Sequence, residues 1–245
     1  MCSFFISIAQ ELKPKFWKEY YTAGVDFLDQ DSFEKAWPYL RDAYTISNEY
    51  FNGKSKYGKS LYQFYKASII QNKFNYIDSL HLNEKCLSYS KTLRGKKRIS
   101  YSKQIEELAD SLLNRGKYKY SISLFEERKS ILEITGNTKD SSYAKVLYGL
   151  GRSYKGTRKN NSEAREHLEN VLSILSYLPE ISSVYKESVL SELFSIYLDF
   201  EQYLKAQNTI NEVFELLEQR IGANDTAFTD KLNQVAIIYW SKNLV

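Results

Sequence analysis

One pattern of apolar and small residues recurs six times along this 245-residue chain and limits what it can fold into. Each copy has four such residues at i, i+3, i+4 and i+7, which lie on one stripe of an α-helix. The third members of the six sets are Gly24, Tyr65, Ala109, Gly151, Phe194 and Ala236, so successive copies are 41, 44, 42, 43 and 42 residues apart. Such regular spacing is the signature of a repeat architecture.

Each repeat carries a second helix. Twelve residues after the third member, or thirteen in the fourth repeat, stands another anchor, and a larger residue usually follows it by four. The anchors are Ala36, Ile77, Ser121, Ala164 and Ala206. Polar turns precede them at 30–31, 72–73, 115–116, 160–161 and 201–202, and Gly53, Gly95, Gly136, Pro179 and Gly222 separate the repeats. Gly and Pro together number only 13, too few for a sheet-rich fold. The sequence therefore predicts an all-α chain of about eleven helices.

These residues resemble the tetratricopeptide repeat (TPR), in its long-period form similar to the kinesin light chain. The best matches are Gly24, Phe27, Ala36, Leu40 and Ala43, with Gly151, Tyr154, Ala164, Leu168 and Val171. The resemblance implies a right-handed superhelical solenoid of five full repeats plus the first helix of a sixth over 16–245, after a lead-in at 1–15. The second repeat departs from the pattern, because Ile77, His81 and Glu84 stand where small or apolar residues are expected.

The resemblance also implies a concave groove, built mainly by the first helices, that binds a peptide or helix of another protein. The groove residues carried over from the family's positions are Tyr21, Val25, Tyr62, Lys66, Lys103, Lys145, Tyr148, Arg152 and Lys155. In the fourth repeat this set combines cations with an aromatic ring, which suits an anionic ligand. The alternative is that these side chains are simply solvated.

Charge is concentrated between residues 51 and 103, which hold twelve Lys or Arg against two acids. The densest part is a basic patch of Lys91, Arg94, Lys96, Lys97 and Arg98. Aromatic residues interleave with this region, namely Phe51, Tyr57, Tyr62, Tyr65, Tyr89 and Tyr101. Basic and aromatic residues together are typical of nucleic-acid binding. Aromatic residues at helical spacing in a repeat are more often core, so an acidic protein partner is preferred and nucleic acid is disfavoured.

No catalytic constellation emerges. His81 and His167 lie in second helices, where packing or exposure is the expected role, and no phosphate-binding loop or HExxH motif occurs. Glu106, Glu107 and Asp110 form an acidic run that we expect to be a solvated helix face. Cys2 and Cys86 are too few for a disulfide framework or a four-ligand zinc site. The chain is therefore expected to be no enzyme and to need no metal or cofactor.

The leading functional hypothesis is a protein-interaction scaffold. The alternative is an N-terminal sensor module of a longer effector protein, such as a CHAT-type caspase-like protease, a kinase or a transcription regulator. A helix without its hairpin partner at the end favours a chain cut from a longer protein, or a partner that covers this helix. A receptor for small signalling peptides ranks lower, since the first helices offer few Asn side chains. No signal peptide and no membrane span is expected, and the predicted location is the cytoplasm.

Overall fold

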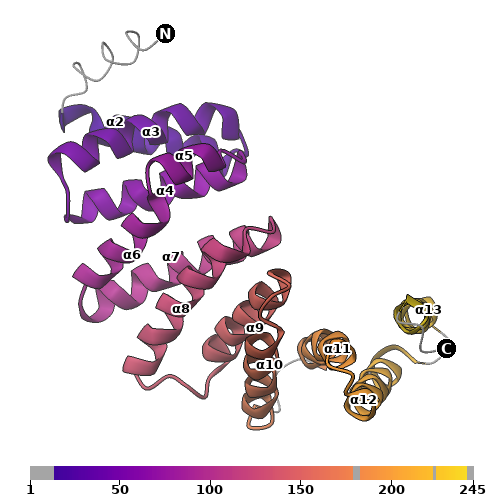
Figure 1. The fold of residues 1–245 in the computed structure, drawn as a ribbon. Helices are drawn as coiled ribbons and strands as arrows, with labels where there is room; N and C mark the ends of the chain where they lie inside the picture. The colour runs from indigo at the N-terminus through magenta and orange to yellow at the C-terminus, as the bar shows by residue number, and fades with distance from the viewer. Residues whose placement is uncertain (1–13, 179–182, 223–224, 242–245) are drawn as a thin grey trace. The chain divides into compact units, whose positions relative to one another are not determined.

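The computed structural model describes residues 14–178, 183–222 and 225–241 (Figure 1), and the side chains of Ser183 and 239–241 lie outside this description. The described residues form twelve α-helices and a short 3-10 helix, η1 (Pro14–Phe16), and contain no strand. The α-helices are α2 (Trp17–Asp29), α3 (Phe33–Tyr50), α4 (Ser55–Ile70), α5 (Phe74–Ser79), α6 (Leu82–Thr92), α7 (Gly95–Asn114), α8 (Tyr118–Ile134), α9 (Ser141–Gly156), α10 (Asn161–Leu175), α11 (Ser183–Asp199), α12 (Tyr203–Ile221) and α13 (Thr226–Ser241). The predicted all-α fold is confirmed, whereas Cys2, Pro179 and most of the lead-in lie outside the described residues.

The chain divides into two compact units, Met1–Ile131 and Leu132–Val245, with the boundary near the end of α8, and each unit is considered by itself. In the first unit α3 packs on α2, α4 packs on α3, and α6 and α7 pack on α4. In the second unit α10 packs on α9, α11 on α10, α12 on α11 and α13 on α12. Within each unit, these helices pack on neighbours that are close to them in the sequence, as a helical repeat requires.

Four of the five turns within hairpins share one geometry. Helix α2 ends at Asp29, Asp31 adopts a left-handed conformation, and the Ser32 N–H donates to the Phe27 carbonyl at 2.8 Å. Asn72, Gly116 and Glu201 repeat this arrangement: the N–H of the left-handed residue donates to the carbonyl three positions back, and the following N–H donates to the carbonyl five positions back. This pair of bonds is a Schellman motif, which ends a helix and reverses the chain in three residues. The fourth turn spans 157–160 and is one residue longer, which accounts for the extra residue between the two anchors of that repeat.

The first and fourth repeats pack at the positions that the sequence predicts. A Cβ placed on Gly24 would lie 2.6 Å from Leu40 Cγ, and a Cβ on Gly151 would lie 2.6 Å from Leu168 Cγ. Leu40 and Leu168 are fully buried. Only a residue without a side chain lets the two helices of such a hairpin approach this closely, so the glycines set the register of both pairs.

The twelve α-helices are one more than the eleven that the sequence predicts, and the second repeat accounts for the difference. Its second helix breaks between α5 and α6 at His81, which is exposed and left-handed with φ 50° and ψ 44°. After the break Leu82 and Cys86 are fully buried, while His81 and Glu84 face solvent. The break thus moves apolar side chains into the core positions that His81 and Glu84 would have filled. The 44-residue interval between Tyr65 and Ala109, the longest of the five, accommodates this shift.

His81→Gly is expected to stabilise the protein by about 0.5–1 kcal/mol, because a residue with a Cβ strains the left-handed conformation and glycine does not. Urea unfolding followed by circular dichroism measures the change. His81→Ala keeps the Cβ and serves as the control, with no gain expected. An equal gain in both variants would contradict this explanation.

A chain of aromatic rings links the helices of the first unit. Neighbouring ring centroids lie between 5.0 and 6.3 Å apart along the series Trp37, Phe64, Tyr44, Tyr57, Tyr89 and Tyr101. Contacts of this kind stabilise a core beyond the area they bury. Cys86 is fully buried in this part of the unit. Burial raises the pKa of Tyr44 to about 12 and that of Cys86 to about 12, and burial also raises the pKa of Tyr57.

These directions predict loss of stability in alkali. A tyrosine whose pKa is higher in the folded state than in the unfolded state favours folding below its unfolded pKa, near 10, and this contribution disappears as pH rises toward the folded pKa. The urea midpoint should fall between about pH 10 and 12, and tyrosinate absorbance should rise together with loss of helical signal. Tyr57→Phe should reduce the decline. Full tyrosine ionisation with the helices intact would contradict the prediction.

Candidate functional site

The first helices of neighbouring hairpins contact one another, and the surface they form is the candidate site of each unit. In the first unit these helices are α2, α4 and α7. The Trp17 indole N–H donates to Ser60 Oγ at 2.7 Å and joins α2 to α4. The Tyr62 hydroxyl donates to the Glu107 carboxylate and joins α4 to α7. We call this surface the first inner face.

The predicted groove residues of the first unit differ in exposure. Tyr21 and Val25 are half-buried, and the Tyr21 ring stacks on Trp17 at 5.1 Å. Tyr62 is only 5% exposed, and its hydroxyl ties α4 to α7. Lys66 lies 5.9 Å from the Tyr62 ring, and Lys103 is exposed.

In the second unit α9 and α11 form the corresponding surface, the second inner face. Lys155 Nζ lies 2.5 Å from one oxygen of the Glu192 carboxylate, and Arg152 Nε lies 3.7 Å from the other. Two cations therefore share one carboxylate. Both remain accessible, with 38% of the Arg152 side chain and 30% of the Lys155 side chain exposed.

Aromatic rings lie beside these charges. The Tyr148 ring packs edge-on against Tyr185 of α11 with centroids 5.3 Å apart, and the Arg152 guanidinium lies over Tyr148 at 5.6 Å. Burial, together with the Glu192 charge, raises the pKa of Tyr148, so this phenol stays a neutral hydrogen-bonding group. Lys145 is exposed one helical turn before Tyr148. Four of the predicted groove residues thus lie along α9.

Glu192 was missed by the sequence reasoning, although it determines the charge of this face. It comes 37 residues after Lys155, and the Tyr62–Glu107 pair is similarly separated by 45 residues. A search for complementary polar side chains about one repeat apart would have found both pairs.

The five cations of the basic patch fall into two groups, those bonded within the protein and those exposed on its surface. The Arg94 guanidinium donates to the backbone carbonyls of Lys91 and Leu93 at the end of α6. The Arg98 guanidinium lies 3.2 Å from the buried Glu127 carboxylate, which also accepts a bond from Ser90. Lys91, Lys96 and Lys97 are exposed. Two of the five cations of the patch are therefore held by the protein itself.

The interleaved aromatic residues do not form a platform for stacking on bases. Among the six, Tyr57, Tyr62, Tyr65, Tyr89 and Tyr101 are each at most 7% exposed. Phe51 is half-buried against Trp17. Single-stranded nucleic acid is bound by exposed rings beside cations, so the aromatic half of that signature is used for packing.

The expectation of a solvated acidic face was wrong for Glu106. Its side chain is buried, and its Oε2 lies 2.9 Å from Nε of Arg128. Arg128 is itself only 2% exposed. Arg128 also donates to Ser102 Oγ at 2.7 Å. Because Arg128 is in the second helix of the same hairpin, this pair fastens α7 to α8.

Arg128→Met should destabilise the protein by about 3–5 kcal/mol, since it removes the buried cation that lies 2.9 Å from the buried Glu106 carboxylate. Chemical denaturation measures the loss. Lys129→Met is the matched control, because its pair with Glu126 is at 4.0 Å and partly exposed, and it should cost at most about 1 kcal/mol. Combining Arg128→Met with Glu106→Leu should recover most of the loss. Equal effects of Arg128→Met and Lys129→Met would contradict the assignment.

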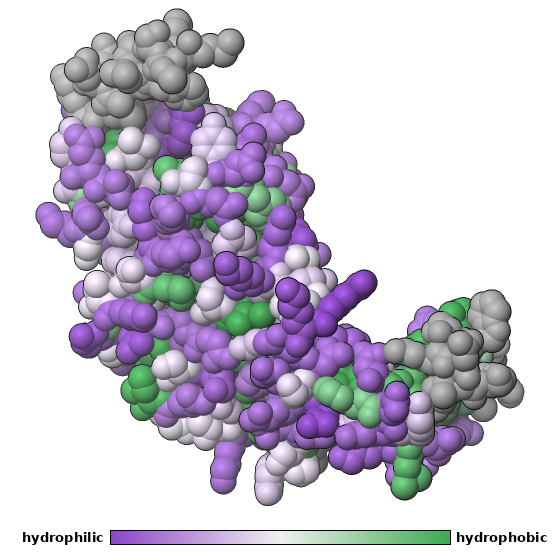
Figure 2. Space-filling model, viewed as in Figure 1, coloured by the Kyte–Doolittle hydropathy of each residue, from purple (hydrophilic) through white to green (hydrophobic). Residues whose placement is uncertain are grey.

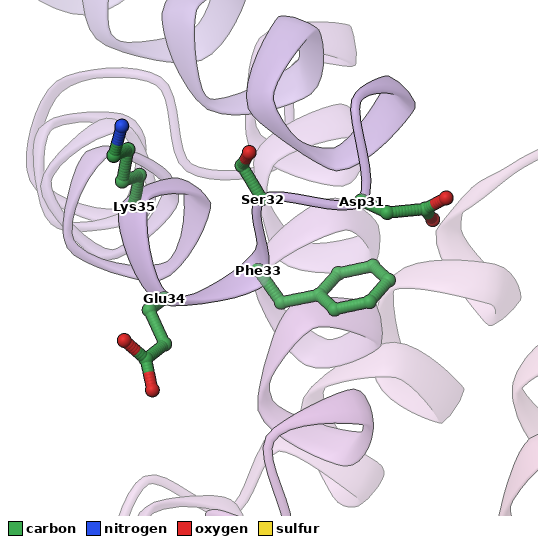
Figure 3. A pocket seen from close by; sticks show the side chains of 5 residues that line it. All are labelled: Asp31, Ser32, Phe33, Glu34 and Lys35. Atoms are coloured by element: carbon green, nitrogen blue, oxygen red, sulfur yellow. The ribbon is translucent and has the colours of Figure 1, made fainter.

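The described surface also carries a small hollow and scattered hydrophobic patches. A hollow of about 340 Å³ at the turn between α2 and α3 is lined by the consecutive residues 31–35. Figure 3 shows the charged groups of Asp31, Glu34 and Lys35 pointing in different directions.

Within the described ranges no group of three His, Cys, Asp or Glu side chains could hold a metal ion. In the same ranges no helix combines the length and apolar character that crossing a bilayer requires. Figure 2 shows separate hydrophobic patches on a mainly hydrophilic face.

Comparison with known proteins identifies the architecture. No protein-family model and no curated protein matches the sequence. Among solved structures, a kinesin light chain-like protein of Podosopora anserina with nearly identical TPR-like repeats is similar, with 19% identity and a TM-score of 0.61 over 85% of this chain and 98% of that chain. BtubC from P. vanneervenii is similar at 13% identity and a TM-score of 0.57, over 86% and 84% of the two chains. PilF of Pseudomonas aeruginosa reaches 15% identity and a TM-score of 0.50, over 94% and 87%.

These likenesses agree with the sequence pattern, the sequential helix pairing and the glycine–leucine contacts within the hairpins. The protein has the fold of a TPR-like helical repeat protein.

Proposed function

We propose that the protein is a non-enzymatic scaffold that binds an acidic peptide or helix of a partner protein on the second inner face. The observation that carries this proposal is the sharing of one carboxylate, Glu192, by Arg152 and Lys155. The cluster of Arg152, Lys155 and Glu192 holds two positive charges and one negative charge, so one positive charge is left over. A carboxylate of a bound segment can approach the exposed parts of both cations.

The neighbouring rings support a peptide as the ligand. Tyr148 and Tyr185 give an apolar wall beside the cations, and the Tyr148 hydroxyl is a hydrogen-bonding group. Helical repeats present such side chains along rows of first helices, which suits an extended or helical segment. The ligand expected here has an acidic residue next to an apolar one.

The charge arrangement also predicts the energetics of binding. A partner carboxylate competes with Glu192 for the same two cations, so part of the attraction replaces an interaction already present. Charges at a partly exposed face contribute mainly to specificity and to the rate of association, and salt screens them. Affinity for the partner should therefore be moderate and should fall with ionic strength.

The test is a selection of random twelve-residue peptides against the full chain, followed by affinity measurements on the selected sequences. We expect enrichment of Asp and Glu beside aromatic or aliphatic residues. Changing both Arg152 and Lys155 to Gln should weaken the selected peptides at least about tenfold, which corresponds to about 1.4 kcal/mol.

The matched control changes Arg158 and Lys159 to Gln. This variant loses the same two charges in the same unit, but from the exposed turn between α9 and α10. The control should bind like the unmodified chain. Selection of neutral peptides, or equal losses in both double variants, would contradict the proposal.

A further inference from the structure

A second candidate site lies in the first unit, where a pocket of about 540 Å³ opens between the start of α4, the end of α6 and the first turns of α7. This volume is within the range of small-molecule sites. The walls come from three helices that pack on one another, so the pocket belongs to the fold of the unit and not to a single loop.

The floor of the pocket is apolar and fixed in place. Tyr89 and Tyr101 line it, are 7% and 6% exposed, and pack edge-on at 5.0 Å. The Tyr89 hydroxyl donates to the Lys54 carbonyl at 3.3 Å. Gly58 is required for this arrangement, because a Cβ there would lie 2.1 Å from Tyr89 Cε1. Leu93 completes the apolar surface.

The rim carries three cations. Lys54, Lys59 and Lys97 line the pocket and are exposed. Within the described part of the chain, none of the three has a carboxylate within 4.0 Å, in contrast to Arg98, Arg128, Arg152 and Lys155. Three unbalanced ammonium groups around one hollow attract an anion of more than one charge.

Hydrogen-bond donors complete the rim. Helix α4 starts at Ser55 with no capping side chain and no acid in its first turn, so no side chain of the helix start competes with an anion for its first N–H groups. Ser55 and Ser100 also line the pocket and bring hydroxyl groups to its surroundings. A helix start beside lysine side chains is a recurrent arrangement for phosphate.

We propose that this pocket binds a small phosphate monoester. Its phosphate group contacts Lys54, Lys59, Lys97 and the start of α4, and its organic part lies against Tyr89 and Leu93. A phosphate monoester fits better than a carboxylate, because it carries nearly two negative charges and three acceptor oxygens at neutral pH. This site is in a different unit from the proposed peptide site, so the two proposals are tested independently.

The experiment titrates the full chain with phenyl phosphate by calorimetry at constant ionic strength. We expect saturable binding with a Kd below about 1 mM, weaker binding of inorganic phosphate, and no binding of phenol. Binding should weaken between about pH 7.5 and 5.5, where the phosphate loses its second charge. Absence of saturation with phenyl phosphate would overturn the proposal.

Two triple variants distinguish a pocket from general positive charge. Changing Lys54, Lys59 and Lys97 to Gln should weaken phenyl phosphate at least about tenfold. Changing the exposed Lys91, Lys96 and Lys119 to Gln removes the same charge from the same unit outside the pocket and should alter Kd less than about twofold. Circular dichroism checks that both variants fold. Equal weakening by the two sets would overturn the proposal.

A peptide tests the source of the phosphate. A ten-residue peptide with a central phosphotyrosine carries the same group on a chain that extends beyond the pocket. Binding of this peptide no tighter than phenyl phosphate supports a small ligand. Binding at least about tenfold tighter would overturn that assignment and indicate a phosphorylated protein segment.

Discussion

The close approach of the two helices in a hairpin is the constraint on which the rest of the fold depends. Where Gly24 faces Leu40 and Gly151 faces Leu168, the missing side chain of one helix receives the buried leucine of the other. A hairpin packed in this way still has apolar side chains on its outer flanks. The next hairpin covers them, which brings first helices of neighbouring hairpins together and creates the inner faces.

The sequence predicted the repeated part of this arrangement well, because helix stripes, turn residues and small residues are local signals. It did not predict the break at His81 or the burial of Glu106. Both depend on contacts between segments: the break places Leu82 and Cys86 in the core, and Glu106 is stabilised by Arg128, 22 residues further along. A periodic pattern records which face of a helix is apolar, but not which charged residue next to that face finds a partner.

In the candidate sites, too, local sequence signals predicted some features, whereas contacts between segments determined others. The positions along α9 followed from the resemblance to the family, whereas Glu192, which sets their charge, comes from the next hairpin. In the basic region, the count of lysines and arginines could not separate Arg98, which pairs with Glu127, from Lys97, which lines a pocket. Composition predicts the amount of charge in a segment, and only packing determines how much of it is free to meet a ligand.

The two proposed sites consequently differ in the free energy that an anion can gain. On the second inner face Arg152 and Lys155 already contact a carboxylate, so a ligand exchanges one anion for another, and discrimination rests on the neighbouring rings and on shape. Around the first-unit pocket Lys54, Lys59 and Lys97 have no carboxylate partner among the residues that the structure describes, and the anion that enters supplies a new interaction. Since the cations of both sites are partly exposed to water, the solvent weakens their attraction for an anion. Preference for a doubly charged ligand is therefore expected at the pocket, and preference for sequence is expected at the inner face.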